Sequence, residues 1–459
     1  MTAAHTSVLV PPRTTAHPGP QPRAAGRDTG IDLVRAVCVL VVVLLHALMV
    51  GVTVDDAGPV FANAAEGAVW FAPLTWVAQI MPVFFVIGGF AGALAYRRMR
   101  TGGGTAVGFV AGRVHRLLLP ALVTISVVGI GLVALAAAAV PGDVVQTAGY
   151  RFAQPLWFLG VFLLCQALLP ALLAAHERAP GRSILVLAAS AVVIDLVRAA
   201  SGIDAIGFLN LALVWLTLQQ VGFFLADGRI DGIRRRTRVL IGAGAVAALA
   251  ASFMAGVFSP DLIENLNPPT VALLLVGIAQ TALLSVLRGP LARLSRRPRV
   301  AAFTDFVTAR TMTIYLWHMP VLLGMAGVTA LIALTSGAVL PEPSSPGWWL
   351  TRPLWLGLAV ALTATAAWAL AGAERRRMPR ATASAARTVQ AVLLGVVGVV
   401  LLLVVGTTAV TAAVAVVLFL LALRRIRARA ARSPKRAGRS ASDTSAFLRD
   451  SAPVDVARW

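Results

Sequence analysis

An arginine and a histidine, Arg35 and His46, lie eleven residues apart in the first apolar segment of the chain. In an α-helix this separation is about 16.5 Å along the axis and about 20° beyond three whole turns, so both side chains share one face. Asp32 lies one turn before Arg35 and can pair with it. Ionisable groups in an apolar span cost free energy and are therefore candidates for function. The pattern predicts a cationic anchor at a membrane boundary and a titratable base near mid-membrane. Snorkelling of Arg35 and an interhelical hydrogen bond of His46 are the structural alternatives.

A second histidine, His318, follows Arg310 by eight residues in another apolar segment. Helical rise places it about 10 Å inside the membrane boundary, with Tyr315 one turn earlier on the same side. Either side chain could orient a carbonyl group or stabilise an oxyanion. We expect both to belong to the catalytic site, and a purely structural hydrogen bond is the alternative.

Other catalytic motifs are missing from the sequence. The two cysteines, Cys38 and Cys165, lie in apolar runs and form no CxxC pair. The remaining histidines form no metal-ligating set, and there is no HExxH, Walker loop or GxSxG. We therefore expect no bound metal and no permanently bound cofactor.

The composition excludes a water-soluble globular protein. The 459 residues are 58% hydrophobic and 13% charged, and the mean hydropathy is +0.82. Forty Lys and Arg against nineteen Asp and Glu give a net charge of +21. In a soluble protein this charge would suggest a nucleic-acid partner, but here the basic residues lie in short loops between apolar runs. The sequence predicts a lipid-bilayer protein with no nucleic-acid partner.

The apolar runs predict an all-α, polytopic membrane helix bundle. A hydrocarbon core of about 30 Å needs roughly 20 apolar residues per helix. On that basis we expect ten spans, at 31–52, 73–95, 117–140, 155–175, 183–201, 205–226, 238–258, 269–287, 311–336 and 351–373.

Loop charges predict the orientation of these spans. Alternate loops carry groups of arginine, whereas the loops between them carry Asp or Glu with only Arg151 and Arg352 as basic exceptions. By the positive-inside rule the N-terminus and the arginine-rich loops are cytoplasmic. We therefore expect a multi-pass protein of the cell membrane.

The two termini differ from this core. Residues 1–29 are rich in Pro, Thr, Ala and Arg and are interpreted as a disordered cytoplasmic leader. Residues 389–423 are apolar over too great a length for one ordinary span and are basic at both ends. We expect a helical hairpin that returns the tail to the cytoplasm, with a single long tilted helix as the alternative. The basic segment 424–459 is expected to be a disordered cytoplasmic tail.

Five short segments resemble the acyltransferase-3 family of integral membrane O-acyltransferases, in the family's order. The first is Gly30–Ala36 (GIDLVRA) followed by His46, which includes the family's Arg-x10-His spacing. The others are Met81–Phe90 (MPVFFVIGGF), Arg113–Arg116 (RVHR), Pro155–Leu159 (PLWFL) and Thr313–Pro320 (TIYLWHMP). Gly88 stands where many members have Ser, so no hydroxyl role is transferred to it. The resemblance covers residues 30–375 and implies a ten-helix acyltransferase domain there.

The resemblance implies an enzyme that transfers acyl groups other than aminoacyl groups. The donor would be cytoplasmic acyl-CoA, and the acceptor a hydroxyl of a glycan, lipid or secondary metabolite, as in O-acetylation of cell-envelope carbohydrate. His46 would be the general base, assisted by His318 and Tyr315. Arg35 with its neighbour Asp32, together with Arg113 and Arg116, would hold the CoA phosphates. For Arg113 and Arg116, topology alone is the alternative.

Two other functions fit a polytopic protein with buried charge. One is a secondary transporter of a small molecule or lipid, although we find no internal repeat and no matched pair of Gly- or Pro-broken helices. The other is a non-enzymatic membrane scaffold, which leaves the alignment of Arg35 with His46 unexplained.

Overall fold

The computed structural model describes residues 28–56 and 58–428 of the chain. The expectations for the leader 1–29 and the tail 424–459 fall outside the described residues except at their inner ends. There, the Asp28 carboxylate caps the first helix by accepting the backbone N–H groups of Gly30 and Ile31, at 3.1 Å each.

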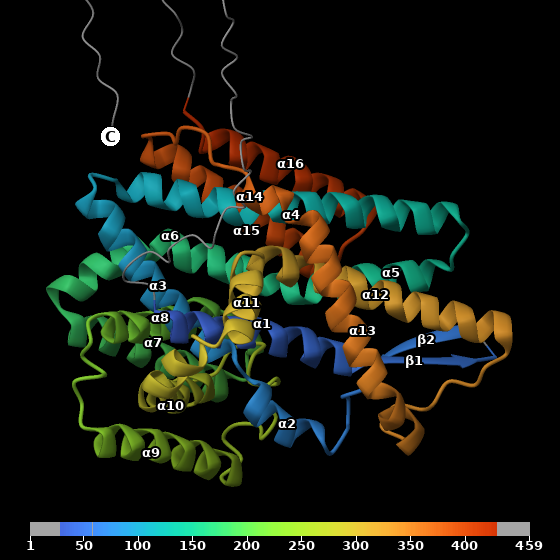
Figure 1. Cartoon of the computed structure of the whole chain (residues 1–459), viewed down its shortest axis with the longest axis horizontal. Coiled ribbons are helices and arrows are strands. Elements are labelled where there is room, and N and C mark those ends of the chain that lie inside the picture. The colour runs from blue at the N-terminus through green and yellow to red at the C-terminus, as the bar shows by residue number, and fades with distance from the viewer. Residues whose placement is uncertain (1–27, 57, 429–459) are drawn as a thin grey trace, which may run out of the picture.

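The protein is an all-α membrane bundle, as the apolar runs predicted (Figure 1). Among the described residues, eleven helical segments are long and apolar enough to cross a membrane. The crossing helices are α1 (Thr29–Met49), α3 (Met81–Thr101), α4 (Ala106–Ala137), α6 (Trp157–Arg178), α7 (Pro180–Ser201), α8 (Asn210–Ala226), α9 (Arg235–Met254), α10 (Ala272–Leu294), α12 (Thr311–Ser336), α13 (Pro346–Leu370) and α15 (Ala385–Val405), to which α16 (Ala409–Arg425) adds a shorter return helix.

Short helices connect these crossings. They are α2 (Phe71–Ala78), α5 (Gly142–Ala153), η1 (Gln154–Leu156), η2 (Asp204–Leu209), α11 (Pro298–Thr308) and α14 (Gly372–Arg375). The arginine-rich loops that follow α3, α6, α8, α10 and α13 lie at one end of the bundle, which we call the basic end. We call the opposite end the far end.

A β-hairpin at the far end was not expected from the sequence. Strands β1 (Val50–Asp55) and β2 (Gly58–Asn63) pair antiparallel, with Val50 opposite Asn63 and Asp55 opposite Gly58. The first span therefore ends at Met49 rather than at residue 52. The reason is local, because β1 (VGVTVD) is rich in β-branched residues, which favour a strand over a further helical turn.

Helix α1 lies inside the bundle, where it packs on α3, α10, α11, α12 and α13 (Figure 1). Beside it, α3 and α8 approach closely through Gly89 and Gly222. A Cβ at Gly89 would overlap the carbonyl of Gln219, and one at Gly222 would overlap the carbonyl of Val86. Only glycine permits this contact, which fixes α8 against α3, a helix that packs on α1.

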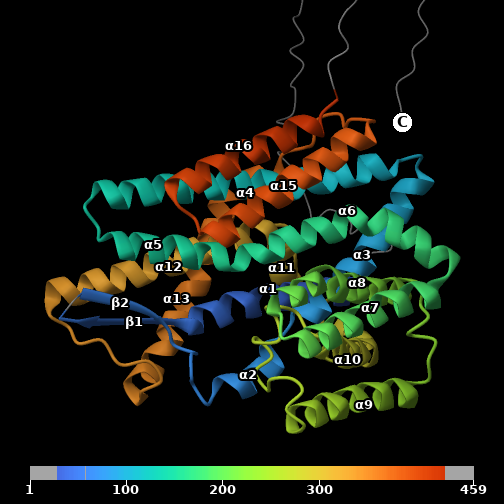
Figure 2. The same cartoon turned by 180° about the vertical axis from the view of Figure 1, so that it is seen from behind.

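The C-terminal apolar stretch forms the expected hairpin, and the single long helix is wrong. Helices α15 and α16 pack against each other and turn at Gly406, whose φ is +84°. Thr408 caps α16 by accepting the N–H of Thr411. Figure 2 shows the pair lying over α4 and α6, so the hairpin is part of the bundle.

Candidate active site

A cavity of about 780 Å³ lies along α1. Seven residues of α1, from Arg35 to Met49, line it, which corresponds to about 21 Å of helix. At the basic end its walls include Arg113, Arg116 and Glu374, and at the far end Gln79 and Asn267. The structure thus places Arg35 and His46 on one continuous cavity, as their shared helix face predicted.

The His46 ring has a defined tautomer. Its Nδ1 lies 2.8 Å from the carbonyl oxygen of Val42. Because a carbonyl oxygen can only accept, Nδ1 carries the hydrogen and Nε2 carries the lone pair. The ring is half-buried and lines the cavity. His46 therefore has the form that a general base requires.

His318 lies directly against His46, although the two residues are far apart in the chain. The ring centroids are 5.0 Å apart and the rings meet edge-on at 69°. His318 is fully buried and its Nδ1 donates to the carbonyl of Tyr315 at 2.5 Å. Its Nε2 has no hydrogen-bond partner among the residues that the structure describes. A buried nitrogen without a partner is costly and so is a candidate for function.

The oxyanion role that we expected for His318 or Tyr315 does not fit this arrangement. Neutral His318 has given its only N–H to a backbone carbonyl and has no donor left. The Tyr315 hydroxyl donates its proton to the carbonyl of Pro155 at 2.7 Å. Tyr315 does line the cavity, and its ring packs edge-on against Phe158. It therefore holds α12 against η1 and the start of α6.

Three arginines converge on the basic end of the cavity. Arg35, Arg113 and Arg116 all line it, although they come from two different helices. Asp32 pairs with Arg35 at 3.0 Å, is buried and does not line the cavity. Asp32 therefore orients Arg35, while the three guanidinium groups offer a cluster of donors for an anion.

Glu374 was missed by the sequence analysis. It lines the basic end of the cavity and its carboxylate accepts the Thr313 hydroxyl at 2.7 Å and the Thr313 N–H at 3.1 Å. These groups begin α12, the helix that carries Tyr315 and His318. An acid at a helix N-terminus is favourable because it meets free N–H groups. The available signal was one acidic residue beside three consecutive arginines, 375–377.

Other polar and aromatic residues of the spans divide between the cavity wall and contacts between helices. Trp157 and Gln166 line the cavity, whereas Asn210, Gln219 and Gln220 do not. Asp195 and Arg198 do not pair with each other. Asp195 accepts from Asn210 at 2.8 Å and from the Val271 N–H at 2.7 Å, and Arg198 pairs with Asp204.

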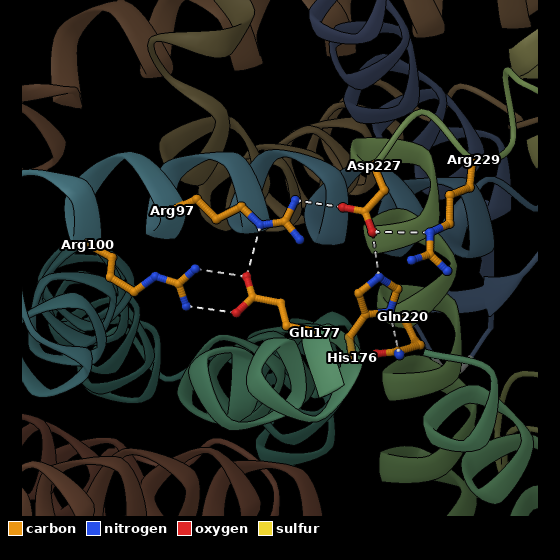
Figure 3. A network of polar contacts seen from close by, with 7 residues as sticks. All are labelled: Arg97, Arg100, His176, Glu177, Gln220, Asp227 and Arg229. Atoms are coloured by element: carbon orange, nitrogen blue, oxygen red, sulfur yellow. Dashed lines mark hydrogen bonds and ion pairs between the residues drawn. The ribbon is translucent and has the colours of Figure 1, made fainter. Parts of the chain in front are cut away.

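A second polar cluster lies at the basic end, between α3, α6 and α8 (Figure 3). We call it the His176 network, and it consists of Arg97, Arg100, His176, Glu177, Gln220, Asp227 and Arg229.

Both nitrogens of His176 are hydrogen-bonded within this network. The Gln220 amide donates to Nδ1 at 2.8 Å, so Nε2 carries the hydrogen and donates to Asp227 at 2.9 Å. Burial raises the pKa of Asp227, but the hydrogen bonds from His176 and Arg97 outweigh it and hold that pKa below its usual range. Arg97 and Arg100 also bind Glu177. The network therefore ties three helices together.

No group of three or more His, Cys, Asp or Glu in the described part of the chain is placed to hold a metal ion. The cavity instead combines an end lined by three arginines with a histidine further along its wall. This combination suits chemistry on a substrate that carries both phosphate groups and a reactive carbonyl.

Comparison with known proteins agrees with this geometry. The model of a family described as "Acyltransferase domain" matches residues 28–372, which include every segment that lines the cavity except α15 and Glu374. None of the curated proteins and none of the solved structures compared with the chain matches it.

Proposed function

Because the chain belongs to the acyltransferase-3 family, we propose that it transfers an acyl group from acyl-CoA to a hydroxyl group of its acceptor. Membership of the family identifies the protein as an acyltransferase, and its apolar helices identify it as a multi-pass membrane protein. The observation that supports the finer proposal is the cavity, which joins three arginines to His46, a histidine whose Nδ1 is bonded to the Val42 carbonyl.

The donor fits the cavity from the basic end. CoA carries several phosphate groups, which Arg35, Arg113 and Arg116 bind through charge-assisted hydrogen bonds. Its extended pantetheine arm then follows α1 and brings the thioester to His46, about 16.5 Å further along the helix. Acyl-CoA is a substrate here, and the proposal needs no resident cofactor.

His46 acts as the general base. Its Nε2 accepts the proton of the acceptor hydroxyl while the hydroxyl oxygen attacks the thioester carbonyl carbon. The tetrahedral intermediate collapses with cleavage of the carbon–sulfur bond, and the proton passes from His46 to the departing thiolate. The products are an ester and free CoA, and His46 returns to its neutral form.

His318 and Tyr315 support this base. The unpartnered Nε2 of His318 lies in a ring that contacts His46, where it stabilises the imidazolium that forms during transfer. Tyr315 is a positioning residue that fixes α12 through its bond to Pro155. The acceptor is a glycan, a lipid or a secondary metabolite, and O-acetylation of cell-envelope carbohydrate is one such reaction.

We assign the basic end to the cytoplasm, where acyl-CoA is available, because of the positive-inside rule. With α16 counted as the return crossing of the hairpin, the number of crossings is even, and the proposal then assigns both termini to that side. Cysteines introduced at Asp55, Asp143, Glu264 and Glu342 are expected to label from outside, and those at Gly103, Gly232 and Arg296 from inside. The native Cys38 and Cys165 are buried and give little background. Inside labelling at two of the first group would reverse the assignment.

The enzymatic proposal is tested with the purified protein in lipid nanodiscs. We expect labelled acetyl-CoA to bind and to release free CoA thiol in the presence of an acceptor extract. The double variant Arg113→Ala/Arg116→Ala is expected to lose binding. Its matched control, Arg178→Ala/Arg182→Ala, removes two exposed arginines at the same end that do not line the cavity. Absence of acyl-CoA binding to the wild-type protein would refute the donor, and a solute uptake assay would then test the transporter.

A further inference from the structure

The C-terminal hairpin lies outside the family match, which ends at residue 372, yet it contributes to the cavity. Three side chains of α15, Val400, Leu403 and Val404, line the cavity wall. Figure 2 shows the hairpin packed along the bundle rather than extending from it. The part of the chain beyond the matched domain therefore shapes the space in which substrate binds.

Close packing holds the α15 wall in place. A Cβ at Gly395 would come within 2.9 Å of Leu118 in α4 and 2.8 Å of Leu163 in α6. The inner face of α15 approaches α6 again where Val399 lies 3.2 Å from the position of a Cβ at Gly160. Interiors packed at this density change shape little, so α15 is a fixed wall.

The wall lies at the far end of the cavity. The turn between α15 and α16 rests on α5, where a Cβ at Gly149 would overlap the carbonyl of Thr407. The next residue of α5, Tyr150, lines the same cavity, as do Gln154 and Pro155. The hairpin and α5 thus enclose the cavity on the side opposite to the arginines.

The wall is aliphatic and reaches the surface of the bundle. Helix α15 contributes no polar or charged side chain to the cavity. Leu403 is half-buried, whereas Val400 is 47% exposed and Val404 is 79% exposed. Leu45, Met49 and Leu211 add further apolar surface to the same cavity. Such a wall favours hydrocarbon over a hydrated sugar, because burying polar groups without partners costs free energy.

We propose that α15 is a hydrocarbon-binding wall, along which an alkyl chain of the substrate lies against Val400, Leu403 and Val404. The chain belongs either to the acyl group of the donor or to a lipid acceptor in the far leaflet. The inference rests on the proposed acyl transfer and deepens it. It makes the hairpin a specificity element added to the acyltransferase domain.

The first experiment tests the donor as the source of the alkyl chain. Dissociation constants are measured in nanodiscs for acyl-CoA esters from acetyl to palmitoyl. Affinity is expected to rise with chain length, by up to about fourfold for each fully buried methylene. Val404 lies at an exposed rim position that tolerates a larger side chain. Val404→Trp should therefore reduce the increase of affinity with chain length, so that the longest ester binds at least tenfold more weakly than it binds the wild type. Leu393→Trp is the matched control, because Leu393 lies about three turns before Val404 on α15, is 57% exposed and does not line the cavity.

The second experiment tests a lipid acceptor, independently of acyl-CoA. A phospholipid with a diazirine in its acyl chain is photolysed in the nanodisc, and labelled residues are identified by mass spectrometry. Bulk lipid labels the exposed Leu393 more than the half-buried Leu403. An alkyl chain bound at the wall would label Leu403 more than Leu393. Val400→Trp should block that binding and return the labelling to the order expected for bulk lipid.

The outcomes separate the two proposals. Chain-length dependence in the first experiment or preferential labelling of Leu403 in the second supports the wall and identifies its source. Binding of all acyl-CoA esters with equal affinity, combined with labelling of Leu403 below Leu393, overturns the wall and leaves acyl transfer intact. Failure of every acyl-CoA to bind refutes the donor, and the lipid labelling still decides the wall.

Discussion

Two regions of the molecule each build a polar cluster around histidine, and they differ in what the second ring nitrogen meets. In the first region, His46 lines the cavity and His318 packs against it. Both donate through Nδ1 to a backbone carbonyl, and no hydrogen bond to either Nε2 occurs among the described residues. In the His176 network, Gln220 and Asp227 occupy both nitrogens of His176 (Figure 3).

The contrast shows that burial alone does not distinguish these histidines. His176 and His318 are both almost fully buried, at 1% and 0% exposed. What differs is hydrogen-bond saturation. A histidine whose two ring nitrogens are both hydrogen-bonded has exchanged its bonds to water for bonds to protein. A buried ring nitrogen without a partner keeps the free-energy cost of its desolvation, which a function can justify.

The largest expected effect is at His46. His46→Gln and His46→Ala should both fold and lose turnover by about 10²–10⁴-fold, the usual contribution of a positioned base. Glutamine keeps a hydrogen bond but cannot take the proton, so a merely structural histidine would tolerate Gln far better than Ala. Acyl transfer by the wild-type enzyme should also fall on the acid side as imidazole protonates.

His176→Gln is the control for this prediction, since it should retain turnover per folded molecule. An active His46→Gln together with an inactive His176→Gln would reverse the comparison. If both variants are active, the base assignment moves to His318, which His318→Gln then tests.

The next effect separates the arginines of the two regions. Arg35→Ala should weaken acyl-CoA binding by about 10–150-fold, because a charge-assisted contact contributes roughly 1.5–3 kcal/mol. Arg97→Ala should leave that affinity unchanged, since Arg97 binds Glu177 and Asp227 instead. Isothermal titration with acyl-CoA measures both. Equal losses in the two variants would mean that net charge, rather than the cavity, attracts the donor.

A smaller effect concerns the stability of the His176 network. Asp227→Asn weakens contacts to His176, Arg97 and Arg229 in a partly exposed site, and should cost about 1–2 kcal/mol of unfolding free energy. Turnover per folded molecule should not change. Thermal unfolding in nanodiscs, followed by circular dichroism, measures the loss. Normal stability combined with reduced turnover would show that the network also serves catalysis.

The smallest effect is the pH dependence of that loss. The pKa of Asp227 is lower in the folded protein than in the unfolded chain, so its contribution is present above the unfolded value and fades as pH falls through the folded one. The stability difference between wild type and Asp227→Asn should therefore shrink below about pH 4. A difference that stays constant down to pH 3 would contradict the lowered pKa.

Much of the fold could be predicted because the membrane makes its main constraints local. A span is recognised from about 20 consecutive residues, and its neighbours in the chain carry the orientation signal. The shared face of Arg35 and His46 was predictable for the same reason, since one helix fixes it. The hairpin turn followed from basic residues on both sides of a long apolar stretch.

Contacts between distant segments decide features that local spacing leaves open. Asp195 and Arg198 are three residues apart on α7, a spacing at which two side chains of a helix can pair. The Asp195 carboxylate instead accepts a hydrogen bond from the backbone N–H of Val271, in a distant segment, and Arg198 pairs with Asp204. Likewise, the first span ends at Met49 because a strand pairing with β2 competes with the last helical turn.

The sequence by itself determined the crossings, the basic end and the helix face that carries Arg35 and His46, because these depend on hydropathy, charge and helical period. Only the tertiary structure brought His318 against His46, Glu374 onto the start of α12 and the α15 wall onto the cavity. Each of these contacts joins segments far apart in the chain. Periodicity shows which face of a helix is buried, but the packing of all the helices decides what that face meets.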